Sequence, residues 1–297
     1  MLARPGLQLL PCASPAFIVE ESRCPVNYRH AYHAGNFGDC VKHAVLVWLL
    51  RALQRKPAPM FVLDTHAGAG RYALDEGAAA RTGEWRSGIA RLLDDPPPAL
   101  SDYVGLVRSL GLYPGSPMIV RALLRANDRL ACCELHPEDA AALRRLFARD
   151  RQVAVHHRDG WEALGALLPP TQRRGLVLID PPYEDRNEFA ALAHGLTVGH
   201  ARFATGVFAA WYPIKQRAPV RAFLDGLRES GMRDILTAEF CLREPVDAGR
   251  LNGCGMLVIN PPYRFELEVP AILVALLGRL GDREPGEAAT VRRIVDE

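Results

Sequence analysis

Short apolar runs alternate along the chain with longer segments whose apolar positions recur at helical spacing. The short runs predict strands at 60–64, 130–134, 152–156, 176–179, 206–211, 234–242 and 256–259. Strands that alternate with helices predict an α/β protein with a mostly parallel sheet and helices on both faces. The last two predicted strands are joined by a loop, so we expect one antiparallel edge, followed by a final helix over 270–280.

Three segments lie outside this regular alternation. Asp39 is the predicted N-cap of a helix that runs to Arg55. About 60 residues separate the first strand from the second, too many for one crossover, so we expect a small helical insertion at about 74–112. Residues 1–26 hold four prolines and no periodic pattern, which predicts a poorly ordered extension in front of a single main domain over 27–297.

Four successive predicted strands end at or close to an acid, in the order Asp64, Glu134, Asp159 and Asp180. The carboxyl ends of parallel strands share one edge of a sheet, where ligands bind. The glycine turn at 68–70 follows the first acid and lets a ligand approach the backbone. We expect a nucleotide cofactor there, with Glu134 on its ribose hydroxyls and Asp159 on its adenine amine.

A nicotinamide dinucleotide is the obvious alternative cofactor for such a sheet. It usually requires a full G-x-G-x-x-G fingerprint and a pyrophosphate cradle, which the turn at 68–73 matches only loosely. The fourth acid also opens the Asp180 motif, Asp180-Pro181-Pro182-Tyr183, which has no role in hydride transfer. The sequence therefore favours S-adenosylmethionine.

The Asp180 motif suits methylation of an exocyclic amine on a nucleobase. Such an amine is weakly nucleophilic, and a carboxylate with a rigid backbone carbonyl can accept its two protons while Tyr183 stacks on the extruded base. A second candidate, the Asn260 motif (Asn260-Pro261-Pro262-Tyr263), offers similar groups. The Asp180 motif is favoured because it follows Asp159 by one strand–helix–strand step.

Charge and cysteine content limit the class of protein. The net charge of +2 does not indicate a nucleic-acid binder, so any such role needs a local basic patch, for which Arg29, Lys42 and Arg71 are candidates. The aromatic segment 27–39 fits a nucleic-acid-facing arm and an irregular lead-in to a helix equally well. Seven scattered cysteines without a Cys-x-x-Cys pair indicate reduced cytoplasmic thiols and no metal site. No apolar run is long enough to span a membrane.

Many motifs match one known family in order along the chain. They include Tyr-Arg-His at 28–30, Lys42-His43, the run 63–72, Arg-Thr-Gly-Glu at 81–84, Tyr-Pro-Gly-Ser-Pro at 113–117, Glu-Leu-His-Pro at 134–137, 179–183 and Trp-Tyr-Pro at 211–213. On these residues the chain resembles the bacterial 23S ribosomal RNA adenine-N6 methyltransferases of the J type.

The resemblance implies a class I, Rossmann-like methyltransferase domain that uses S-adenosylmethionine, without a metal, on one adenine of 23S ribosomal RNA. It also implies a cytoplasmic monomer that acts on protein-free RNA or an early assembly intermediate. With the spacing arguments, it assigns cofactor contacts to His43, His66, Gly68, Ser116, Glu134, Asp159, Gly160 and Asp180. The catalytic residues would be Asp180, Pro181 and Tyr183, and the RNA contacts Tyr28, Arg29 and Lys42.

Two other functions stay open on the residues alone. A DNA adenine or guanine-amine methyltransferase would use the same motif and the same chemistry. A non-catalytic RNA-binding protein of ribosome assembly would keep the cofactor pocket but transfer no methyl group.

Overall fold

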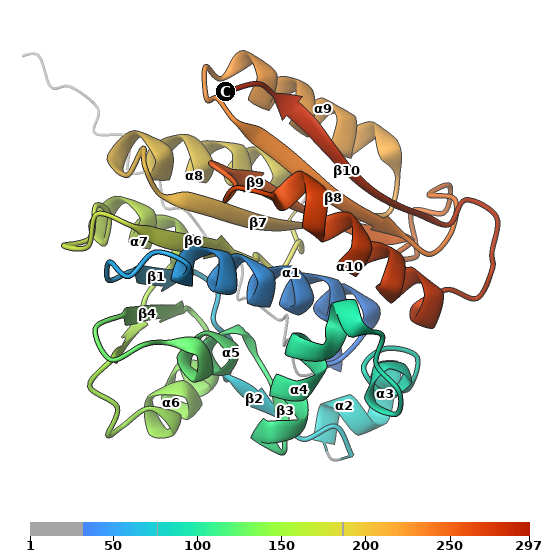
Figure 1. Ribbon diagram of the computed structural model, residues 1–297, viewed down its shortest axis with the longest axis horizontal. Coiled ribbons are helices and arrows are strands. Elements are labelled where there is room, and N and C mark those ends of the chain that lie inside the picture. The colour runs from blue at the N-terminus through green and yellow to red at the C-terminus, as the bar shows by residue number, and fades with distance from the viewer. Residues whose placement is uncertain (1–31, 76, 186) are drawn as a thin grey trace, which may run out of the picture.

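The computed structural model describes residues 32–75, 77–185 and 187–297 (Figure 1). The predicted extension at 1–26 and the candidate RNA contacts Tyr28 and Arg29 lie outside the described residues. One large sheet organises the fold, in the order β10-β8-β9-β7-β6-β1-β4-β5. Its strands are β1 (Phe61–Asp64), β4 (Arg129–Glu134), β5 (Val153–His157), β6 (Gly175–Ile179), β7 (Val207–Ile214), β8 (Ile235–Cys241), β9 (Gly253–Ile259) and β10 (Ala288–Val295).

The neighbouring strands β7, β6, β1, β4 and β5 are all parallel, which confirms the predicted α/β class. Each strand sends alternate side chains to opposite faces. In β6, Leu176 and Leu178 join one hydrophobic core while Val177 and Ile179 join the other. Helices cover both faces (Figure 1), so these runs are apolar throughout rather than alternating.

The helices divide between the two cores. The first core holds side chains of α1 (Phe37–Gln54), α5 (Ser116–Leu123) and α10 (Phe265–Leu280), and the second holds those of α7 (Gly160–Ala166), α8 (Glu188–Arg202) and α9 (Arg217–Glu229). A further helix, α6 (Pro137–Leu146), follows β4. In the described part of the chain, no helix is both long and apolar enough to cross a membrane.

The C-terminal part of the sheet has the predicted antiparallel edge, but another strand forms it. The antiparallel strand β9 is not at the edge but lies between β7 and β8. The edge is β10, a strand that the sequence pattern did not predict. Arg292 and Arg293 make this segment look like polar surface, and their charges are neutralised by ion pairs with Glu239 and Asp234.

Helix α1 begins earlier than predicted. Its N-cap is Asn36, whose side chain accepts a hydrogen bond from the backbone N–H of Asp39 at 3.0 Å. Asp39 is not the cap but lies in the first turn, buried, where its carboxylate accepts the backbone N–H of Gly35 at 2.9 Å. The first turn of α1 therefore has a buried acid on its inner side.

A run of short helices is inserted along the chain between two short antiparallel strands, β2 (Arg71–Tyr72) and β3 (Tyr113–Pro114). It contains α2 (Gly77–Thr82), η2 (Glu84–Arg86), α3 (Ala90–Leu93), η3 (Pro98–Leu100) and α4 (Ser101–Leu110). Its buried residues Ile89, Leu92 and Tyr103 belong to the same core as α1 and α10. This helical segment therefore packs against the domain and borders the carboxyl edge near the start of α1 (Figure 1).

Candidate active site

Four acids meet at the carboxyl edge of the sheet. Asp64 ends β1 and Glu134 ends β4, while Asp159 caps α7 just after β5 and Asp180 directly follows β6. Because β5, β4, β1 and β6 are parallel neighbours, their ends converge, as in other open α/β sheets. The structure thus brings together the four acids that the sequence placed there.

Backbone groups hold Glu134 in place. Gly68, in the left-handed region at φ +62°, donates its N–H to one carboxylate oxygen at 2.7 Å. The N–H of His136 donates to the other oxygen, also at 2.7 Å. Burial raises the pKa of Glu134, and these two donors oppose that rise. The glycine turn and the acid therefore form one preorganised unit.

Gly160 and His66 form the next part of the edge. A Cβ on Gly160 would lie 2.3 Å from the carbonyl oxygen of Thr65, so only glycine lets α7 begin against the turn. His66 accepts or donates a hydrogen bond with the Thr65 hydroxyl at 2.8 Å and packs edge-on against Trp161. Burial lowers the pKa of His66 to about 4. At neutral pH its ring is uncharged and does not repel a cation.

Asp64 is fully buried, and burial raises its pKa to about 7. The Ser116 hydroxyl lies near enough to oppose this rise, while the charge of Asp180 adds to it. No described residue gives either Asp64 oxygen a hydrogen bond of full geometry. A buried carboxylate in this state calls for a partner. A cationic group such as the ammonium or sulfonium of S-adenosylmethionine would supply one, so the acids fit this cofactor.

His43 lies deeper than the other candidate cofactor residues. It is fully buried in α1, and its Nδ1 is 3.0 Å from the hydroxyl of Tyr113 in β3. Tyr103 packs edge-on against the same ring. These contacts tie α1 to the helical segment, and a cofactor contact of His43 stays a prediction.

A buried ion-paired group joins α1 to the Asp180 motif. Lys42 Nζ lies 2.5 Å from Asp180 Oδ2 and 2.8 Å from Asp39 Oδ1, and its side chain is only 4% exposed. Burial alone lowers the pKa of Lys42, but the two carboxylates outweigh it and the pKa is raised overall. Lys42 therefore stays charged and holds one oxygen of Asp180.

The predicted contact of Lys42 with RNA stays a prediction. Its ammonium already pairs with the carboxylates of Asp180 and Asp39, and the side chain is almost fully buried. The sequence located Lys42 correctly in the first part of α1 but could not show that it points inward. We therefore assign Lys42 to the support of Asp180.

Tyr183 is held firmly at the other end of the motif. Its hydroxyl donates to the carbonyl oxygen of Trp211 at 2.9 Å, and its ring packs edge-on against Phe189 and Trp211. Its backbone is left-handed at φ +52°, a strained conformation for an aromatic residue that is typical of functional sites. Its position is therefore fixed by the protein.

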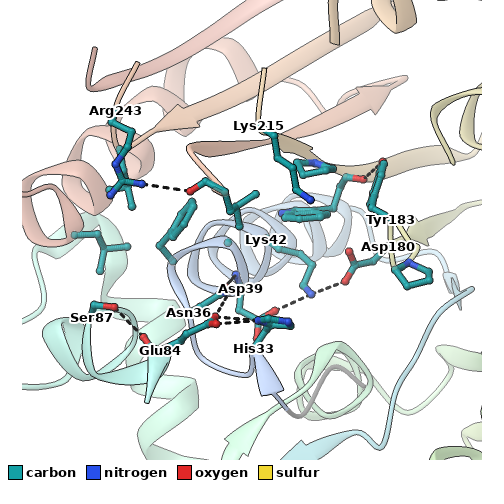
Figure 2. Close-up of a pocket in the computed structure, with 18 of the residues that line it drawn as sticks. His33, Asn36, Asp39, Lys42, Glu84, Ser87, Asp180, Tyr183, Lys215 and Arg243 are labelled. Atoms are coloured by element: carbon teal, nitrogen blue, oxygen red, sulfur yellow. Dashed lines mark hydrogen bonds and ion pairs between the residues drawn. The ribbon is translucent and has the colours of Figure 1, made fainter. Parts of the chain in front are cut away.

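A pocket of about 520 Å³ opens beside the Asp180 motif (Figure 2). Its wall combines the motif with the start of α1, the helical segment, the end of β7, the loop between β8 and β9, and the end of α10. The lining residues that the sequence did not single out include Ser87, Lys215, Leu242, Arg243, Leu251 and Asp282. Glu134, Asp159 and Gly68 are not among its lining residues, so the pocket and the acid-lined edge meet at Asp180.

The Asn260 motif lies elsewhere. Because β9 is antiparallel to β7, Ile259 pairs with Phe208 near the start of β7, at the opposite edge of the sheet. The side-chain amide of Asn260 donates to the carbonyl oxygens of Ala204 and Gly206, both at 2.8 Å. The structure therefore separates this motif from the four acids.

The strand order, the acid-lined carboxyl edge and the glycine turn are together those of the class I methyltransferase fold. The sequence model for the family "Ribosomal RNA large subunit methyltransferase D, RlmJ" matches residues 57–294. The chain therefore belongs to the RlmJ family of ribosomal RNA large subunit methyltransferases, which confirms the resemblance.

Relatives in this family match most of the chain. The Escherichia coli K12 protein "Ribosomal RNA large subunit methyltransferase J" is 42% identical over 280 residues, which are 92% of this chain and 100% of that protein. The Haemophilus influenzae protein of the same name is 41% identical over 257 residues, 84% of this chain and 92% of that one. A crystal structure of a Legionella pneumophila protein superimposes with a TM-score of 0.80 at 34% identity, and covers 88% of this chain and 98% of its own.

Proposed function

We propose that this protein transfers a methyl group from S-adenosylmethionine to the N6 amine of one adenine in 23S ribosomal RNA. The observation that carries the proposal is the position of Asp180. It lies where the acid-lined edge meets the pocket, and Lys42 holds it from inside the protein. The family supplies the substrate class, since its named relatives are methyltransferases of large-subunit ribosomal RNA.

Each residue of the edge has a task that suits this cofactor. Glu134 would bind the ribose hydroxyls, Asp159 the adenine amine, and Asp64 with Ser116 the charged methionine end. The turn at Gly68 and the close approach at Gly160 would give the cofactor access to backbone. When bound, S-adenosylmethionine supplies an electrophilic methyl group on a cationic sulfonium.

Asp180 would prepare the target amine. Lys42 engages Oδ2, which leaves Oδ1 to accept a hydrogen bond from the amine. The backbone carbonyl beside Pro181 would accept the second N–H, and both bonds would turn the nitrogen lone pair out of conjugation with the ring. Oδ1 or water would then take the spare proton. Tyr183, locked by its bond to Trp211, would lie against the extruded base.

The finer features follow from the resemblance. As an enzyme of ribosomal RNA, the protein would act in the cytoplasm, as a monomer, on protein-free RNA or an early assembly intermediate. A DNA or guanine-amine methyltransferase would use the same carboxylate, but the named relatives favour ribosomal RNA. A non-catalytic assembly protein would have no use for a strained Tyr183 and a buried lysine behind Asp180.

Mass spectrometry of nucleosides from ribosomal RNA tests the proposal. We expect cells without the gene to lose one N6-methyladenosine from their large-subunit RNA and no modification from the small subunit. Unchanged methylation of the large-subunit RNA would contradict the proposed function.

A further inference from the structure

One cation of the pocket is not used by the site described above. In the described part of the chain, the pocket wall contains the cationic side chains of Lys42, Lys215 and Arg243. Lys42 pairs with two acids, and Arg243 forms two hydrogen bonds of 2.9 Å with the carboxylate of Glu284. Lys215, just after β7, is exposed, and within 32–75, 77–185 and 187–297 no partner is found for its ammonium. Figure 2 shows this side chain directed into the pocket.

The charges around Asp180 explain why a separate cation would be needed. Lys42, the cation at that end of the pocket, is already engaged by the carboxylates of Asp39 and Asp180. These carboxylates attract a sulfonium but repel an RNA phosphate. A phosphate that enters with the target base therefore needs a positive group farther along the wall, and Lys215 is in that position.

Part of the pocket wall is apolar and aromatic. Phe37, Trp211 and Leu251 contribute to it. The Trp211 ring is fixed between Tyr183 and α1, where a Cβ on Gly38 would lie 3.3 Å from Trp211 Cζ2. Proteins that bind single-stranded nucleic acid combine fixed aromatic rings for the bases with cations for the backbone.

The size of the pocket also exceeds the needs of one base. Cavities of roughly 300–1,000 Å³ enclose whole drug-sized ligands, and this pocket has about 520 Å³. We propose that it holds the nucleotide next to the target adenosine. The base of that nucleotide packs against Trp211 and Phe37, and its phosphate binds Lys215. This subsite rests on the proposed function and adds a specificity-determining contact to it.

The experiment compares two lysine variants on the full-length protein. Lys215→Met removes the charge in the pocket, and Lys56→Met removes another exposed charge, just beyond the far end of α1. With large-subunit RNA, we expect Lys215→Met to raise KM about tenfold, the effect of one charge-assisted hydrogen bond, and to leave kcat within about twofold. The negative slope of log(kcat/KM) against log[salt] should become shallower by about 0.7–0.9, the value for one phosphate contact. Lys215→Arg should restore both quantities.

Modified RNA identifies the contact directly. After the methylated adenosine has been mapped, each flanking phosphate is replaced in turn by an uncharged methylphosphonate. We expect one replacement to weaken the wild type about tenfold and to have no further effect on Lys215→Met. Additive losses at every flanking phosphate, or equal losses in Lys56→Met and Lys215→Met, would overturn the subsite. A wild type that methylates no RNA would instead overturn the proposed function, and the subsite with it.

Discussion

The Asp180 motif and the Asn260 motif share three of four residue types and follow buried strands, yet their surroundings differ in every respect. The side chain of Asp180 is 12% exposed and is bound by a buried lysine. The side-chain amide of Asn260 donates hydrogen bonds to two backbone carbonyls at the opposite edge of the sheet. Tyr183 is locked among aromatic rings, whereas Tyr263 is 85% exposed. A motif of this kind has its chemical meaning only at the carboxyl edge of the parallel strands.

Strand direction is the cause of the difference. β6 runs parallel to β1 and delivers its last residue to the edge where the acids gather. β9 runs antiparallel to β7, so the same short sequence at its end is delivered to the other edge. There Pro261 and Pro262 end a strand, and Asn260 fastens it to the segment before β7.

The largest expected effect is on methyl transfer by variants of the two motifs. Asp180→Ala removes the acceptor for the target amine, so we expect the single-turnover rate to fall at least about 10³-fold, as for loss of an essential proton acceptor. Binding of S-adenosylmethionine, measured by calorimetry, should survive. Asn260→Ala should keep the rate within about twofold. Loss of activity in Asn260→Ala, with activity kept in Asp180→Ala, would show that the other motif is the active one.

The second effect concerns Lys42, the buried lysine that pairs with Asp180 and has no counterpart at Asn260. Lys42→Met removes the buried charge that pairs with Asp39 and Asp180, and removal of one partner from a buried ion pair costs about 3–5 kcal/mol. We expect this loss in the free energy of unfolding, measured in urea. The transfer rate should also fall about 10²-fold at a temperature where the variant is still folded. A variant with wild-type rate would refute the assignment of Lys42 to the support of Asp180.

The third effect is a pH dependence of cofactor binding at the acid-lined edge. Asp64 has a pKa of about 7, raised by burial, and only its ionised form attracts a cation. The affinity for S-adenosylmethionine should therefore rise about tenfold from pH 6 to pH 8. Because the folded state holds this proton longer than the unfolded state, the cofactor-free protein should lose stability as pH rises from about 4 through 7.

Calorimetry in buffers of different ionisation heat measures the proton released on binding. Asp64→Asn is the matched variant, since it keeps the shape of the side chain and cannot ionise. It should flatten the pH dependence of both affinity and stability. An equally steep dependence in Asp64→Asn would assign the titration to another group.

Local sequence was enough to predict the parallel half of the fold and its edge. The apolar runs before Asp64, Glu134 and Asp180 predict strands, and the acid at the end of each run is the functional group. The glycine turn and the short step from Asp159 to Asp180 then set the order of the acids. Each of these features is contained within a few neighbouring residues.

The remainder depends on residues far apart along the chain. Lys42 and Asp180 are 138 positions apart, so the inward direction of Lys42 could not be inferred from its place in a helix. The interior position of β9 depends on which strands it pairs with. Strand β10 could not be predicted because the acids that pair with Arg292 and Arg293 lie more than 50 residues earlier in the chain. The sequence could not indicate the place of Lys215, because the pocket it lines is built by segments far apart along the chain.

The most direct test of the account combines deletion of the gene with the two motif variants. Nucleosides from large-subunit RNA are quantified by mass spectrometry in deletion cells that carry the wild type, Asp180→Ala or Asn260→Ala. The account predicts that N6-methyladenosine is lost on deletion and restored by the wild type and by Asn260→Ala, but not by Asp180→Ala. Restoration by Asp180→Ala, or no loss on deletion, would contradict it.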